Sequence, residues 1–384
     1  MGGADVAKRA LLVTASVVFA FLVTEAGFRL DGYRQGIDYR LYLKELTNAD
    51  RMPRVLLQPD ETLGVTLVPN TQALQVTSDF SVVYRINSKG LRDREYDYAK
   101  PPGKLRVLAL GDSFTFGTGI PYGARFTDIP EDQLDGVEVI NTGVPGWGTE
   151  AELLFLAREG LRYRPDVVMI FINFVDTRRQ RPNLFRDGGI DLPAPTEASQ
   201  SPSQALSREE QAAQRQEGGT LYLKADDPLF KERGWLVRHS YAASYLSFRL
   251  ALAQHRQEFE QQDAERWQKT DADRQGLASS VGTHVPTASE RTMLVLRKFV
   301  ELSRAEKFRL VIVNISGWAH LDFVKDVDPS VEYHDLAPVL IAESQKRPIL
   351  FKYDNHLNPD ANALLGREVT EILRPLAKEY AARH

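Results

Sequence analysis

The stretch RVLALGDSFTFGTG, Arg106 to Gly119, decides how the rest of the chain is to be interpreted. Four apolar residues run into Gly111-Asp112-Ser113, and a continuous apolar run is typical of a strand covered on both faces. Ser113 therefore follows a predicted strand and precedes a predicted helix, at the carboxyl edge of a sheet, where α/β folds hold their sites. A serine hydroxyl is a weak nucleophile, so a catalytic Ser113 requires a histidine base and an orienting carboxylate.

One of the seven histidines has neighbours suited to that task. In YDNHLNP, Asp354 precedes His356 by two residues, on a predicted loop that leads into the C-terminal helix. A carboxylate this close in a turn can hold one ring nitrogen and leave the other free to accept the serine proton. The other histidines lack this setting and are expected to be structural or surface residues: His239, His255, His284, His320, His334 and His384.

Further apolar runs predict the rest of a buried sheet. They are LRVLALG, VEVINTG, DVVMIFINF and FRLVIVNIS, separated by helical stretches, which indicates an α/β sandwich from residue 104 to residue 384. The helix after Gly148 begins with Thr149 and has Glu152 three residues later, a pattern that predicts a capping box. A polar segment at about 186–289 interrupts the alternation. It is expected to be a mobile loop or lid followed by a solvated or interdomain helix.

The N-terminal part of the chain predicts a membrane segment and a small β-rich extension. The apolar run Ala10 to Val23 follows Lys8 and Arg9, and its length suits a cleaved signal peptide or a single anchor. We favour an anchor over residues 1–30, because no small-x-small cleavage site follows. By the positive-inside tendency, Lys8 and Arg9 stay cytoplasmic and the remainder lies on the other side. Residues 31–103 read as a connector and short strands.

The composition excludes several classes of site. The chain has 384 residues and a formal net charge of -4, so no global basicity indicates nucleic-acid binding. The absence of cysteine removes disulfides, thiolate nucleophiles and zinc–thiolate sites. The histidines and carboxylates show no familiar metal-ligand spacing, and the glycines fit neither a P-loop nor a dinucleotide-binding turn. We therefore expect no metal and no cofactor.

Three short blocks, taken in order, resemble those of the SGNH hydrolases, also called the GDSL esterase/lipase family. They are GDSFTFG with Ser113, NTGVPGWG with Gly146, and DNHLNP with Asp354 and His356. The resemblance runs from Leu105 to the C-terminus, and INSKGLRDREY upstream resembles the approach to the serine in bacterial membrane-anchored members. It implies a three-layer α/β/α sandwich with a flavodoxin-like parallel sheet of about five strands.

The resemblance also implies roles for individual residues. Ser113 would attack an ester carbonyl, His356 would take and return the proton, and Asp354 would orient the ring. The amides of Ser113 and Gly146 and the side chain of a block III asparagine would form the oxyanion hole.

Block III is where this sequence departs from the family pattern. It usually reads Gly-x-Asn-Asp, whereas here Asn173 stands where the glycine would, Val175 where the asparagine would, and Asp176 follows. The oxyanion asparagine is therefore either missing or supplied by Asn173 from a strand end shorter by two residues.

Several further residues are candidates for substrate binding. Around the predicted site these are Asp112, Trp147, Asp176, Arg178 and Arg179. The basic run that contains the two arginines reads either as a solvated loop or as a surface that attracts an anionic substrate, such as an acidic polysaccharide or a phospholipid headgroup.

Three functions fit these observations. The first is a serine esterase that cleaves acyl esters, in particular O-acetyl groups, of a cell-envelope or secreted glycan. It would be held by one helix in the bacterial inner membrane with its catalytic domain in the periplasm, or secreted if the N-terminal segment is cleaved. The second is an acyltransferase that uses the same triad, and the third is a non-catalytic glycan-binding or scaffold protein with a degenerate site.

Overall fold

The structure is a computed structural model. It describes residues 3–35, 56–77, 79–173, 185–186, 189–190, 192, 234–254, 286–316, 324, 326–352 and 354–383.

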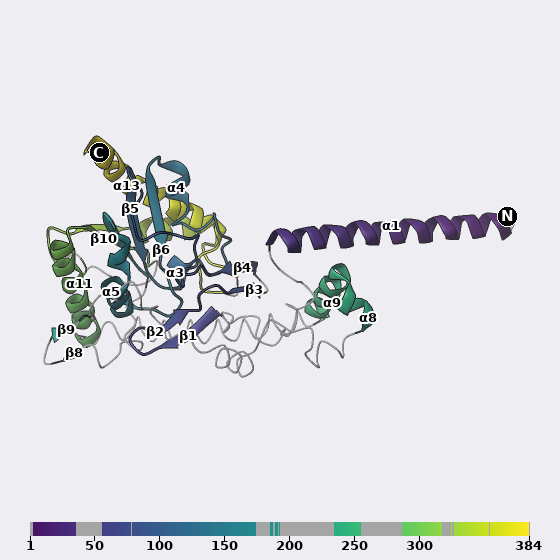
Figure 1. Cartoon of the computed structure of the whole chain (residues 1–384), viewed down its shortest axis with the longest axis horizontal. Helices are drawn as coiled ribbons and strands as arrows, with labels where there is room; N and C mark the ends of the chain where they lie inside the picture. The colour runs from purple at the N-terminus through teal and green to yellow at the C-terminus, as the bar shows by residue number, and fades with distance from the viewer. Residues whose placement is uncertain are drawn as a thin grey trace.

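A five-stranded parallel sheet forms the centre of the molecule (Figure 1). Its strands in chain order are β5 (Leu105–Leu110), β6 (Val137–Asn141), β7 (Val167–Ile172), β10 (Arg309–Asn314) and β11 (Glu332–Asp335). Their order across the sheet is β11-β10-β7-β5-β6, and every neighbouring pair is parallel. Numbered along the chain, this is the 2-1-3-4-5 order of flavodoxin-like folds, in which ligands bind where the strand order reverses. The expected α/β sandwich is confirmed.

Helices cover both faces of the sheet and divide the core into two layers (Figure 1). Helices α5 (Thr149–Arg158) and α11 (Pro286–Glu306) pack on one face, and α12 (Ala337–Ser344) and α13 (Pro359–Arg383) on the other, where α4 (Ile129–Gln133) contacts α13. Strand β5 serves both layers, because Leu108 and Leu110 face the α5 side while Val107 and Ala109 face the α13 side. A 3₁₀ turn, η3 (Gly160–Tyr163), follows α5.

Two antiparallel hairpins precede the sheet and form the expected β-rich extension. They pair β1 (Leu57–Asp60) with β2 (Gly64–Leu67) and β3 (Gln72–Val76) with β4 (Ser81–Arg85). Buried residues of both hairpins, among them Leu67 and Tyr84, belong to the core layer on the α5 side. The hairpins therefore share the core of the sandwich.

The predicted capping box at α5 is wrong. Gly148 is the N-cap, with no side-chain hydrogen bond, and Thr149 is already the first helical residue. Glu152 consequently cannot reach back to a cap and is buried instead, with a relative exposure of 3%.

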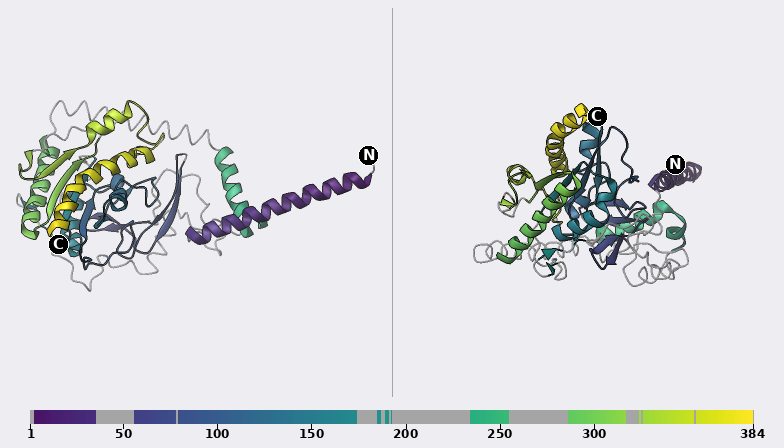
Figure 2. Two further views of the ribbon diagram at one scale, coloured as in Figure 1. Left: turned by 90° about the horizontal axis from the view of Figure 1, so that it is seen from above. Right: turned by 60° about the vertical axis from the view of Figure 1, so that its left-hand side comes forward.

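A long N-terminal helix, α1 (Gly3–Gln35), extends away from the sandwich (Figure 2). Its segment Lys8–Arg34 is long and apolar enough to cross a membrane, by length and composition. Two helices from the predicted polar segment, α8 (Trp235–His239) and α9 (Tyr241–Gln254), lie beside its C-terminal part (Figures 1 and 2). That segment also has a short hairpin of β8 (Phe185–Arg186) and β9 (Gly189–Ile190). Its remainder, where we expect a lid, lies outside the described residues.

Candidate active site

Ser113 is the first residue of a four-residue helix, α3 (Ser113–Phe116), directly beyond strand β5. The preceding Asp112 is the N-cap, and its carboxylate accepts a hydrogen bond of 2.8 Å from the amide of Phe114. Gly111 permits the sharp turn, since a Cβ there would lie 2.0 Å from the hydroxyl oxygen of Thr115. Strand, glycine and cap together fix Ser113 at the carboxyl edge of the sheet.

The other end of this turn is held by Arg92, a fully buried side chain from the upstream GLRDREY stretch. Its guanidinium donates to the carbonyl oxygens of Phe116, at 2.7 Å, and of Gly117, at 2.6 Å, and also to that of Ile120. These carbonyls close helix α3, so Arg92 stabilises the turn that carries the serine. Sequence reasoning noted the stretch but missed this role.

The loop with His356 is anchored on both sides. Asn358 caps α13 by accepting a hydrogen bond of 3.0 Å from the amide of Ala361, and it donates one of 2.7 Å to the carbonyl of Pro348. On the other side, the amide of Phe351 donates to the carbonyl of His356 at 3.1 Å. The LNP sequence after the histidine therefore both begins the helix and fixes the loop.

Ser113, His356 and Asp354 lie in one hydrogen-bonded chain. The serine Oγ lies 2.7 Å from Nε2 of His356, and Nδ1 of the same ring contacts Oδ1 of Asp354. The Asp354 carboxylate also accepts the backbone amide of His356 at 2.9 Å, which fixes the short turn between them. Phe114 packs against the imidazole with ring centroids 5.0 Å apart. The imidazole is partly exposed, so a substrate can reach it.

Gly146 lies in the loop after β6, the neighbour of β5 in the sheet. Its φ of 92° lies in the left-handed region, where a side chain would be strained, so the loop geometry requires glycine. Asn141, the last residue of β6, ties this loop to the serine turn: its amide nitrogen donates to the carbonyl of Thr115 at 2.5 Å, and its Oδ1 accepts from the amide of Gly143 at 2.9 Å.

Asn173 directly follows β7, the neighbour of β5 on the other side. Asn173 is 6% exposed, and its Oδ1 has no hydrogen-bond partner among the residues that the structure describes. The three expected oxyanion donors thus come from the ends of three adjacent strands. Val175 and Asp176 lie outside the described residues.

A buried acid behind the serine turn was not anticipated. Glu152 in the first turn of α5 is 3% exposed, and its Oε2 has no hydrogen-bond partner in the described part of the chain. Burial raises the pKa of this carboxyl well above its ordinary value, and the charge of Asp112 raises it further. Glu152 is therefore held towards its neutral form.

The remaining candidate residues either serve the fold or lie outside the described residues. Trp147 is buried against Phe155, and its indole nitrogen donates to the carbonyl of Val65 at 2.7 Å, so its polar atom serves the fold. Asp112 acts as the cap described above. Arg178 and Arg179 lie outside the described residues. Of the other histidines described, His239 contacts the carbonyl of Trp235 and His334 contacts Glu332, both away from the serine.

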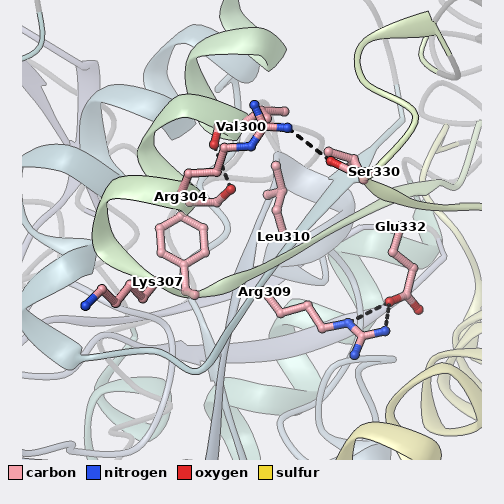
Figure 3. A pocket seen from close by; sticks show the side chains of 10 residues that line it. Val300, Arg304, Lys307, Arg309, Leu310, Ser330 and Glu332 are labelled. Atoms are coloured by element: carbon pink, nitrogen blue, oxygen red, sulfur yellow. Dashed lines mark hydrogen bonds and ion pairs between the residues drawn. The ribbon is translucent and has the colours of Figure 1, made fainter.

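A surface cavity of about 480 Å³ lies at the opposite edge of the sheet, by the start of β10 (Figure 3). Two of its cations already have partners: Arg304 bonds Asp328 at 2.8 Å, and Arg309 bonds Glu332 at 2.7 Å. Because Ser113 follows the carboxyl end of β5, this cavity is separate from the serine site.

No protein-family model and no curated protein matches the sequence. Among solved structures, the chain is similar to a member of the lipolytic protein G-D-S-L family from Veillonella parvula DSM 2008, with 12% identity, a TM-score of 0.34, and coverage of 70% of this chain and 98% of that chain. It is also similar to the lipase/acylhydrolase from Enterococcus faecalis, with 14% identity, a TM-score of 0.35, and coverage of 70% and 95%. The chemistry is therefore inferred from the site itself.

Proposed function

We propose that the chain is a serine esterase of the SGNH type that cleaves acyl esters through Ser113, His356 and Asp354. The observation that carries the proposal is the 2.7 Å contact between Ser113 Oγ and His356 Nε2, with Asp354 on the other ring nitrogen. This arrangement supplies a base for the serine proton and a carboxylate for the resulting imidazolium, which is what a serine nucleophile requires.

Acylation follows from these contacts. As Ser113 Oγ attacks the ester carbonyl carbon, its proton passes to Nε2 of His356, which is within hydrogen-bond reach. Asp354 holds the proton on Nδ1 and thereby selects the tautomer with a free Nε2. The imidazolium then returns a proton to the leaving alkoxide, so the alcohol departs and the acyl group stays on Ser113.

The negative charge that develops on the carbonyl oxygen needs donors at the carboxyl edge of the sheet. The proposal assigns this role to the amides of Ser113 and Gly146 and to the Asn173 side chain. Each such donor is typically worth about 10²- to 10³-fold in rate. Water, activated by the same imidazole, then hydrolyses the acyl-enzyme and regenerates Ser113.

The proposed substrate is an O-acetyl ester of a glycan on the outer side of the inner membrane. Helix α1 is long enough to span a bilayer, and Lys8 and Arg9 precede its apolar part. The positive-inside tendency then puts the sandwich on the side where envelope glycans are found. An acetyl ester is small enough to require no deep acyl pocket beside Ser113.

Acetate release from an O-acetylated polysaccharide tests this activity. The full chain in detergent is expected to release acetate, and Ser113→Ala is expected to release none above background. The matched control is Ser344→Ala, an exposed serine on α12 that should keep full activity. Equal release by Ser113→Ala and the unaltered chain would rule out Ser113 as the nucleophile.

The same assay separates hydrolysis from acyl transfer. Addition of an unacetylated acceptor sugar should leave acetate release unchanged if water is the acceptor. If acetate release falls while acetyl groups appear on the sugar, the enzyme is an acyltransferase that uses the same triad.

A further inference from the structure

Helix α1 contacts a segment more than 200 residues later through two charged side chains. The carboxylate of Glu25 accepts hydrogen bonds from the Ser240 hydroxyl at 2.6 Å and from the amides of Tyr241, at 3.1 Å, and Ala242, at 2.9 Å. Arg29, which pairs with Glu25 at 2.6 Å, donates to the carbonyl of His239 at 3.0 Å. Figures 1 and 2 show α8 and α9 against the C-terminal part of α1.

These contacts make Glu25 a cap for α9, supplied by another helix. The first amides of a helix have no partner within it, and a carboxylate at that end both accepts their hydrogen bonds and complements the helix dipole. Aromatic contacts reinforce the junction: Phe28 and Tyr245 have ring centroids 4.7 Å apart, and Arg29 lies over the Tyr241 ring. Helices α8 and α9 are therefore fixed to one level of α1.

That level lies within about 6 Å of the outer boundary of a bilayer whose inner boundary is at Arg9. At about 1.5 Å per residue, Glu25 lies about 24 Å along the helix from Arg9, and a hydrocarbon core is about 30 Å thick. If Arg9 lies at the cytoplasmic boundary, Glu25 and the start of α9 lie near the opposite boundary, where a polar junction between helices is tolerated.

At this level, α8 and α9 expose large apolar side chains. Trp235 is 66% exposed, Leu246 is 59% exposed, and Leu236 is also exposed. On α1, Leu22 and Val23 are exposed as well. Tryptophan is characteristic of the interface between lipid and water, and the exposed Trp235 at the start of α8 fits that position.

We infer that residues 234–254 form an interfacial helix pair that lies on the outer leaflet, with Trp235, Leu236 and Leu246 in contact with lipid. The inference rests on α1 being the membrane anchor of the proposed function. The pair would fix the orientation of the anchor at the membrane surface.

Single-cysteine labelling of the full chain tests the inference, because the chain has no cysteine of its own. An environment-sensitive fluorophore is attached at Trp235→Cys or Leu246→Cys in vesicles of phosphatidylethanolamine and phosphatidylglycerol. Lipids that carry a spin label at carbon 5, close to the headgroup, should quench the fluorescence of the label at either position. Two control positions accompany these variants. A fluorophore at Phe19→Cys within α1 should be quenched by lipids spin-labelled deeper in the acyl chain. A fluorophore at the exposed Tyr122→Cys on the sandwich should not be quenched.

Two outcomes would overturn the inference while leaving the anchor intact. In the first, fluorophores at positions 235 and 246 emit as they do in water while the fluorophore at position 19 is quenched. This would show that the helix pair does not touch lipid. Blue-shifted labels that lipid does not quench, and that revert to water-like emission on dilution with empty vesicles, would show that a second copy of the chain covers the patch. Absence of quenching at 19 would instead remove the anchor itself.

Discussion

Ser113 depends for its reactivity on groups from distant parts of the chain. Its base, His356, follows it by 243 residues and reaches it from the loop before α13. The local sequence predicted the strand, the turn and the pairing of Asp354 with His356, because each depends on neighbours along the chain. The structure brings the three residues together, and their catalytic roles remain predictions. The burial of Glu152 and the three bonds of Arg92 could not be predicted, since their partners are set by tertiary packing.

Asn173 is the residue whose role is least constrained by the sequence. If its side chain donates to the oxyanion, Asn173→Ala should lower turnover by about 10²- to 10³-fold and leave the Michaelis constant nearly unchanged, because the bond strengthens in the transition state. Steady-state kinetics on an acetyl ester measure this, and a thermal unfolding midpoint near that of the unaltered chain shows that the fold is intact. Unaltered turnover would remove Asn173 from the oxyanion hole.

Glu152 makes the stability of the fold depend on pH. Its folded-state pKa is raised by burial and by Asp112, so the unfolded chain releases this proton at lower pH than the folded chain does. The free energy of unfolding therefore falls as pH rises from about 4.3 towards the folded-state pKa, by about 1.4 kcal/mol for each pH unit in that window.

Glu152→Gln removes this dependence and should unfold at higher urea concentration than the unaltered chain at pH 8, with little difference at pH 4. Glu301→Gln, an exposed glutamate on α11, is the matched control and should show no such trend. The stability of Glu152→Gln is compared with that of the unaltered chain at each pH. A variant that loses stability relative to the unaltered chain as the pH rises from 4 to 8 would contradict the burial argument.

At the scale of elements, four of the five sheet strands were predicted because they are continuous apolar runs. The fifth, β11, reads EYHD, is only partly buried and lies at the edge of the sheet, so periodicity could not reveal it. The hairpins before the sheet were expected from composition. The support of α3 by Arg92, which follows the second hairpin, was not expected, since it depends on a contact across the fold.

The contribution of Arg92 to stability can be measured by comparing a substitution at Arg92 with the same substitution at Arg94. Arg92→Lys keeps the charge but loses the planar donor group that bonds three carbonyls, and each hydrogen bond to a charged group contributes about 1.5–3 kcal/mol. We expect a loss of about 3 kcal/mol in the free energy of unfolding by urea, together with reduced turnover. Arg94→Lys, in a partly exposed pair with Glu131, should cost less than about 1 kcal/mol. Equal losses would mean that Arg92 has no special role.

At the scale of the whole molecule, the chain combines a sandwich with a helix that leaves it. A membrane helix could be predicted from the apolar run of α1 and the cations before that run. Its contacts with α8 and α9 could not, because Glu25 and Ser240 are 215 residues apart. The arrangement predicts a catalytic site on the far side of the membrane from the N-terminus.

Membrane topology provides a prediction at this scale. In spheroplasts of a bacterial host, a membrane-impermeant maleimide should label Tyr122→Cys without lysis and Asp5→Cys only after lysis. Both positions are exposed, so access to the reagent alone decides the result. Labelling in the reverse order would place the sandwich in the cytoplasm and contradict the proposed substrate side.

The central claim is that His356 and Asp354 activate Ser113, and reaction with a fluorophosphonate tests it most directly. The serine oxygen displaces fluoride from phosphorus, and intact mass with peptide mapping locates the adduct. We predict one adduct on Ser113 of the full chain, none on Ser113→Ala or His356→Ala, and slower reaction with Asp354→Asn. Absence of an adduct on Ser113, while a known serine hydrolase in the same tube is fully labelled, would contradict the account.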